Sequence, residues 1–241
     1  MHPMTRLSKS ELRKACWQAL RDAGAARFPG VVGRIPNFVG AEAAAERLVA
    51  TDLWASAQVL KCNPDSPQRP IRHRALKQGK LVFMAVPRLR EEAPFLALDP
   101  SQLDPGALWA ASSIKGGEAM GIPTRLEDMP PIDLIVTGCV GVTRQGARLG
   151  KGGGYSDLEY ALLREHGKVK ADTPVATSVH GSQVLPAHAI PMQPHDISLD
   201  LVVTPDRTIR CKRAHARPEG VLWDVLEPEK RDAIPVLAKG P

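Results

Sequence analysis

The chain has 241 residues, 43% of them hydrophobic, and a formal net charge of +6. This length is enough to bury a large core as one domain. We expect a single domain over residues 1–241, in which residues 211–241 form a C-terminal extension packed on the body. The positive charge favours anionic partners, whether a nucleotide, a polyglutamate or nucleic acid, and does not choose among them. Of these partners we expect nucleic acid least.

The cysteines and the N-terminus restrict where such a chain works. Four cysteines are scattered without a Cys-x-x-Cys pair, which argues against both a disulfide framework and a zinc site. Residues 1–6 lead into a charged segment rather than the apolar core of a signal peptide, and no apolar run approaches the roughly 20 residues of a membrane span. We therefore expect a cytoplasmic protein with reduced thiols and no membrane partner.

The first predicted element is a helix. Ser8 and Glu11 have the spacing of a capping box, and apolar residues then recur at helical spacing up to Gly24. A connection rich in proline and glycine follows over residues 28–38, and the alanine-rich composition of residues 41–60 indicates one or two helices.

A basic helix comes next. Residues 71–78 form a short predicted helix closed by Gly79. A charged face turned to solvent is the favoured account of its basic residues, and docking of a polyglutamate tail or RNA is the alternative. These residues are Arg69, Arg72, His73, Arg74 and Lys77.

Several apolar runs predict strands, and residues 94–131 predict mainly loops because prolines and glycines recur there. Strands that alternate with helices imply an α/β fold: an open, mostly parallel sheet covered by helices on both faces. Ligands of such sheets collect at the carboxyl ends of the strands. The predicted strands are residues 81–86, 132–136, 173–179, 199–204 and 208–211.

The glycine-rich stretch over residues 146–157 is the most informative one. It lacks the pattern of a Walker A loop, because Lys151 is followed by glycine, and it lacks the dinucleotide fingerprint. Glycines without β-carbons let backbone N–H groups converge on an anion at a helix N-terminus, and Arg148 and Lys151 add positive charge. Asp157 can cap the helix or hold Mg²⁺. A tight turn that binds nothing is the alternative.

This stretch resembles the signature of the 5-formyltetrahydrofolate cyclo-ligase family. Thr137 and Ser156 depart from the family pattern, and these departures, with residues 34–38 and 63–68, resemble the methenyltetrahydrofolate synthetase domain-containing branch. The resemblance implies a three-layer fold like that of the NagB, RpiA and CoA-transferase proteins. The residues that fall on the signature are Gly146, Arg148, Leu149, Gly150, Gly152, Gly154, Tyr155 and Asp157.

The resemblance also implies a reaction. In this family ATP phosphorylates the formyl oxygen of 5-formyltetrahydrofolate, N10 attacks the activated carbon, and phosphate leaves as 5,10-methenyltetrahydrofolate forms. The implied cofactors are ATP and Mg²⁺, the latter held by Asp157, and the implied partner is a reduced folate that can carry a polyglutamate tail. The implied nucleotide-binding residues are Lys9, Arg13, Arg148, Gly150, Lys151, Gly152, Gly153, Gly154, Tyr155 and Asp157.

Other residues leave alternatives open. Lys9 and Arg13 alone would fit a solvated basic face, and it is the resemblance that makes them nucleotide ligands. Asp65, Gln68 and Tyr155 are the implied folate-binding residues, although Asp65 is shorter than the glutamate of the family. A diverged paralogue with another substrate, or a nucleotide- or RNA-binding module, therefore remains the second hypothesis. His180 and His195 follow or precede strands, and a structural role is favoured for both.

Overall fold

The computed structural model describes residues 7–238 and 240, so the expectation about residues 1–6 lies outside the described residues. An eight-stranded sheet runs through the molecule in the order β11-β10-β8-β5-β1-β2-β3-β4. Strands β10, β8, β5, β1 and β2 run parallel, whereas β11, β3 and β4 are antiparallel to their neighbours. The strands are β1 Val59–Cys62, β2 Leu81–Ala85, β3 Phe95–Leu98, β4 Ile122–Thr124, β5 Leu134–Val136, β8 Val175–Ser178, β10 Leu201–Val203 and β11 Thr208–Arg210.

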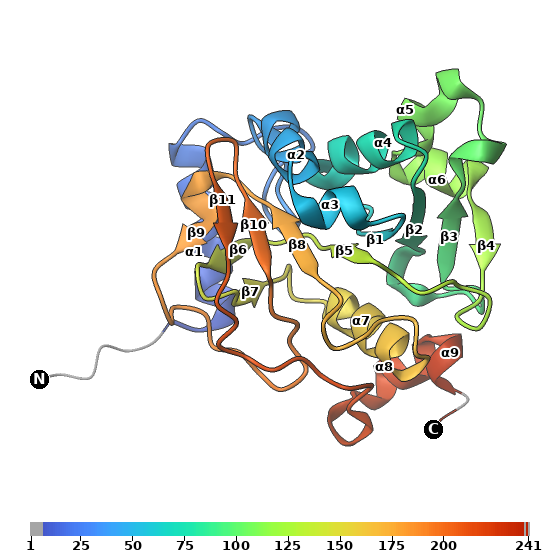
Figure 1. The fold of residues 1–241 in the computed structure, drawn as a ribbon. Coiled ribbons are helices and arrows are strands. Elements are labelled where there is room, and N and C mark those ends of the chain that lie inside the picture. Colours follow the sequence, from blue (N-terminus) through green and yellow to red (C-terminus); the bar gives the residue numbers. More distant parts are fainter. Residues whose placement is uncertain (1–6, 239, 241) are drawn as a thin grey trace, which may run out of the picture.

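Helices cover both faces of this sheet, as the sequence predicted. Figure 1 shows α2, α3 and α4 above the sheet and α7, α8 and α9 below it. The predicted capping box of Ser8 and Glu11 is present at the N-terminus of α1. The helices are α1 Lys9–Asp22, α2 Ala41–Val49, α3 Asp52–Ser56, α4 Arg69–Lys77, α5 Leu108–Ala111, α6 Ile114–Met120, α7 Tyr155–Glu165, α8 Pro228–Ala233 and α9 Pro235–Ala238.

The two faces of the sheet carry separate apolar clusters. Alternate side chains of a strand point to opposite faces, and Leu60 and Cys62 of β1 accordingly pack in the cluster that includes α2 and α4. Residues of α7, such as Leu162, belong to the other cluster. Lys61 lies between Leu60 and Cys62 and therefore projects toward α7.

A second, three-stranded sheet contributes two strands, β6 and β7, directly before the glycine loop, and its third strand, β9, comes after α7. Its order is β7-β6-β9, in which β6 pairs antiparallel with β7 and parallel with β9. The loop therefore follows β7 rather than directly following the strand at residues 132–136, and Arg148 stands in a strand. These strands are β6 Gly141–Thr143, β7 Arg148–Leu149 and β9 Val184–Leu185.

Two expectations about the secondary structure have different outcomes. The expectation of one or two helices over residues 41–60 is confirmed by α2 and α3, although the last two of these residues belong to β1, a central strand of the sheet that the sequence did not predict. The predicted loops of residues 94–131 contain β3, α6 and β4. Both strands lie at the sheet edge beyond β2, where tertiary pairing overrides weak local preference.

The expectation of a wholly solvated basic face on α4 was also wrong. Arg74 is exposed as predicted and pairs with Glu46. Arg72, however, is 1% exposed, and its guanidinium donates to carbonyl oxygens of Asn63, Pro64 and Ser112. Arg72 thus satisfies the backbone of the turn after β1 rather than binding solvent or an acidic tail.

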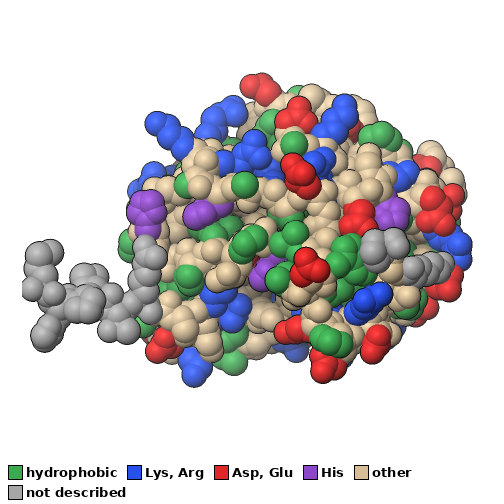
Figure 2. Space-filling view, turned by 90° about the horizontal axis from the view of Figure 1, so that it is seen from below, with side chains coloured by type: hydrophobic (Ala, Val, Ile, Leu, Met, Phe, Trp, Pro, Cys, Tyr) green, Lys and Arg blue, Asp and Glu red, His purple; other side chains and the backbone are tan. Residues whose placement is uncertain are grey.

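Charge on the surface is mixed on the face that includes the C-terminal helices. Figure 2 shows basic and acidic side chains interspersed on that face rather than gathered into one basic stripe. Within residues 7–238 and 240, no helix combines the length and the apolar character needed to cross a bilayer.

Candidate active site

The glycine loop joins β7 to α7 with backbone angles that favour glycine. Gly152 has φ +111° and Gly154 has φ +69°, in the left-handed region. Gly154 occupies the N-cap position of α7 and offers no side-chain cap, so the first N–H groups of the helix have no side-chain partner there. Such a helix start carries partial positive charge and suits an anion.

A cavity of about 490 Å³ opens beside this loop. It lies at the carboxyl ends of β1 and β2, where the α/β fold was predicted to bind a ligand. Tyr155 and Asp157 of α7 line it, as do Asp65 after β1 and Arg88 after β2. Of the predicted glycines, Gly150, Gly153 and Gly154 line the cavity, with Lys151.

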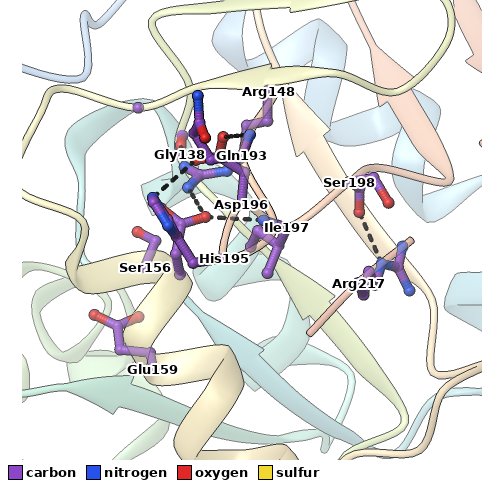
Figure 3. A network of polar contacts seen from close by, with 12 residues as sticks. Gly138, Arg148, Ser156, Glu159, Gln193, His195, Asp196, Ile197, Ser198 and Arg217 are labelled. Atoms are coloured by element: carbon purple, nitrogen blue, oxygen red, sulfur yellow. Dashed lines mark hydrogen bonds and ion pairs between the residues drawn. The ribbon is translucent and has the colours of Figure 1, made fainter. Parts of the chain in front are cut away.

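Arg148 and Asp157 form a buried ion pair at the loop. The guanidinium Nη2 is 2.5 Å from Asp157 Oδ1, and Nη1 donates to the carbonyl oxygen of Gly138 at 3.2 Å (Figure 3). The backbone N–H of Ile197 also donates to Asp157 Oδ1, at 3.0 Å. Burial opposes the charge of Arg148, but Asp157 together with Cys139 and Asp196 raises the pKa of the guanidinium overall. The pair holds the cation rigidly against the loop.

Lys9 and Arg13 of α1 reach the same region. Arg13 Nε donates to the carbonyl oxygen of Gly150 at 2.7 Å, and its guanidinium lies against Gly152. Lys9 Nζ is 2.5 Å from Asp196 Oδ2. Neither side chain is a freely solvated charge, and Arg13 buttresses the glycine loop from outside the cavity.

The predicted folate residues separate in space. Asp65 lines the cavity, and its Oδ1 lies 4.0 Å from Nζ of Lys151. Burial raises the pKa of the Asp65 carboxyl, an effect that Lys151 and Arg72 partly oppose. Gln68 is fully buried, its Nε2 donates to Ser178 Oγ at 3.2 Å, and its Oε1 has no hydrogen-bond partner among the described residues. Gln68 therefore lies behind the cavity wall rather than on it.

A polar network on the cavity floor was not predicted from the sequence. Lys61, 1% exposed, pairs with Glu159 of α7 and donates to Asn63 Oδ1 at 2.8 Å. Asn63 Nδ2 in turn donates to Ser156 Oγ at 2.7 Å. Figure 3 shows Ser156 and Glu159 projecting from α7, and both line the cavity with Asn63. The sequence feature that could have indicated this network is Lys61, a lysine inside a short apolar run.

The two histidines have different surroundings. His180 accepts from the backbone N–H of Ser182 at 3.2 Å and caps a short turn, which agrees with the structural role favoured from the sequence. His195 Nε2 lies 3.8 Å from Oδ1 of Asp196, beside the Lys9 contact. No group of three or more His, Cys, Asp or Glu side chains that could hold a metal ion occurs in the described part of the chain.

Comparison with known proteins identifies relatives. A model of the "5-formyltetrahydrofolate cyclo-ligase family" matches residues 5–205. Methenyltetrahydrofolate synthase domain-containing proteins of Danio rerio and Homo sapiens are 32% and 34% identical; the alignments cover 99% and 96% of this chain but only 64% and 61% of those proteins. The chain thus spans less than two thirds of their length.

Two further matches are to proteins named as a cyclo-ligase or a synthetase. A 5-formyltetrahydrofolate cyclo-ligase of Mycolicibacterium smegmatis is 30% identical over 57% of this chain and 66% of that protein. The NMR structure of Aquifex aeolicus 5,10-methenyltetrahydrofolate synthetase aligns with a TM-score of 0.54 and 19% identity, covering 87% of this chain and 96% of that one. This likeness shows a shared fold.

Proposed function

Because the chain belongs to the 5-formyltetrahydrofolate cyclo-ligase family, we propose that it closes 5-formyltetrahydrofolate to 5,10-methenyltetrahydrofolate at the expense of ATP, releasing ADP and phosphate. The observation that carries this proposal is the glycine loop, which opens with the buried Arg148 onto a cavity of about 490 Å³. That volume falls within the range of small-molecule sites, about 300–1,000 Å³. In this proposal the single domain over 1–241 carries the whole site.

We assign the nucleotide phosphates to the loop. The backbone N–H groups from Gly150 to Gly154 and those at the start of α7 would hold phosphate oxygens. The side chain of Lys151 is half exposed and lies 4.0 Å from Asp65, so it can turn toward these oxygens. Arg148 would neutralise charge on the transferred group from a fixed position. Arg13 and Lys9 support this arrangement from α1, Arg13 through Gly150.

Asp157 fits a role in holding Mg²⁺. Its two hydrogen bonds within the described residues both use Oδ1, which leaves Oδ2 available. Mg²⁺ in phosphoryl-transfer sites is commonly bound by one or two carboxylates together with phosphate oxygens, so one such atom is sufficient. When bound there, the ion would supply charge neutralisation between phosphates.

We place the folate in the remainder of the cavity. Asp65 and Tyr155 line it and would contact the pterin, whereas Gln68 would act only by supporting the wall through Ser178. The reaction transfers a phosphoryl group to the formyl oxygen, after which N10 forms a bond to the formyl carbon and the oxygen departs in phosphate. The protein's task is positioning and charge stabilisation, and the reaction demands no general base from a side chain.

One observation favours a second candidate, a diverged paralogue without this activity that acts on another substrate or binds nucleotide or RNA. The buried pair of Lys61 and Glu159 makes the cavity floor ionic beside the proposed pterin position. A floor of this kind suits a substrate with polar or charged groups at that position.

The test is the formation of 5,10-methenyltetrahydrofolate, followed by its absorbance, with Mg²⁺, ATP and 5-formyltetrahydrofolate. An increase that depends on ATP is expected, and Lys151→Ala should slow it more than Lys170→Ala, a matched change at an exposed lysine away from the cavity. A flat trace from a protein that still binds ATP would transfer support to the diverged paralogue.

A further inference from the structure

The chain continues past residue 205, where the family match ends, and returns to the glycine loop. Arg217 donates to the carbonyl oxygen of Ser198 at 2.9 Å (Figure 3) and pairs with Asp200 at 2.5 Å. The backbone N–H of Val221 donates to Glu165 of α7 at 2.8 Å. Figure 1 shows α8 and α9 beside α7 on the lower face of the sheet. The segment after residue 205 is therefore held against α7, the helix that follows the glycine loop.

Lys230 of α8 lies at the start of that helix. Its Nζ is 3.4 Å from where a β-carbon on Gly154 would stand and 5.9 Å from the centre of the Tyr155 ring. Its acidic partner, Glu227, is 3.2 Å away and has a side chain 72% exposed. Ion pairs with exposed carboxylates are weak, so Lys230 can exchange Glu227 for a stronger anion at little cost.

A second hollow, of about 150 Å³, separates α7 from the C-terminal segment. Lys230 lines it with Leu158 and Val221, and Gly154 and Asp157 line both this hollow and the main cavity. Lys230 thus lines a hollow that shares two wall residues with the main cavity, and its volume of about 150 Å³ is enough for a phosphate group.

The charge of Lys230 is opposed by the dipole of α7, and its ion-pair partner is the exposed Glu227. The N-terminus of α7 carries partial positive charge, and a lysine beside it repels that end of the helix dipole. Two other cations near the loop already have fixed partners, since Arg148 pairs with Asp157 and Lys9 pairs with Asp196. An anion on the loop would turn the repulsion at Lys230 into attraction.

We propose that Lys230 is a positioning residue for the phosphates of the bound nucleotide, supplied to the glycine loop by the C-terminal segment. This inference rests on the proposed function, because it assumes that the loop binds ATP. It extends the site beyond the part of the chain that matches the family model. It also gives the C-terminal segment a function besides covering apolar surface of α7.

The experiment measures Mg²⁺-ATP affinity by calorimetry for the full chain and for three variants. Lys230→Ala should bind ATP about tenfold more weakly, the size expected for loss of a charge-assisted contact. Lys230→Arg should restore most of the affinity. Arg231→Ala is the matched control, because Arg231 is a neighbouring cation of α8 that stacks over Trp223, 5.6 Å away. Arg231→Ala should bind ATP with the same affinity as the unchanged chain.

A second measurement separates charge from packing. If Lys230 contacts phosphate, added salt should weaken ATP binding to the unchanged chain more than to Lys230→Ala. Equal affinities of the unchanged chain and Lys230→Ala would overturn the role of Lys230 and leave the proposed function standing. Absence of ATP binding by the unchanged chain would instead refute the proposed function itself.

Discussion

The buried pair of Lys61 and Glu159 gives a sharp test of how the cavity floor is stabilised. Their side chains are 2% and 6% exposed, and Lys61 also donates to Asn63. Lys61→Met would leave the Glu159 carboxylate buried without its cation, and breaking such a pair costs about 3–5 kcal/mol. For a chain of this size each kcal/mol lowers the melting temperature by about 2–4 °C, so a decrease of about 6–20 °C is expected.

Replacing both partners should give a different result. Lys61→Met combined with Glu159→Leu leaves no unpaired charge, and double replacements of this kind are often neutral or stabilising. We expect the double variant to melt within a few degrees of the unchanged chain. Urea unfolding followed by circular dichroism provides the free energies. The exposed pair of Arg74 and Glu46 is the control, and Arg74→Met should cost less than about 1 kcal/mol. A double variant as unstable as the single one would refute the argument.

Three further predictions follow from buried groups. Arg148→Met should destabilise the chain by about 3 kcal/mol, because Asp157 loses its cation, and should abolish ATP binding measured by calorimetry. Burial raises the pKa of Asp65 above its ordinary value of 3.8, so as the pH rises above 3.8 the unfolded chain loses this proton before the folded chain does, and the free energy of unfolding falls. The stabilising effect of Asp65→Asn, measured by urea unfolding, should therefore grow between pH 4.5 and 7.5. A difference that stays constant with pH would contradict this. Burial raises the pKa of three thiols, Cys16, Cys139 and Cys211, to about 11. Cys16 and Cys139 are in addition only 1% exposed, so these two should react with Ellman's reagent only after unfolding.

The elements predicted correctly are those whose cause lies within a few residues. The capping box of α1 joins Ser8 to Glu11, and the first turns of α7 follow directly from the glycines before it. The alternation of such segments was also sufficient for the fold class. In each case the determining interaction is local, and a sequence pattern records it directly.

The errors concern contacts between distant segments. Strand β1 was missed because Lys61 interrupts its apolar run, and its partner Glu159 lies 98 residues away. Arg72 was expected in solvent because basic helix faces are usually solvated, but it is buried and donates to the carbonyl oxygen of Asn63 and to others beside it. The contact of Lys9 with Asp196 spans 187 residues. No spacing rule predicts pairs of this kind, although the resemblance did indicate that Lys9 belongs near the site.

The fate of the formyl oxygen tests the central claim most directly. The measurement supplies 5-formyltetrahydrofolate labelled with oxygen-18 in its formyl group, together with Mg²⁺ and ATP, and analyses the released phosphate by mass spectrometry. If the glycine-loop cavity brings the phosphoryl group to the formyl oxygen, the phosphate carries the label and forms in equal amount with 5,10-methenyltetrahydrofolate. Unlabelled phosphate, or phosphate released without ring closure, would contradict the account.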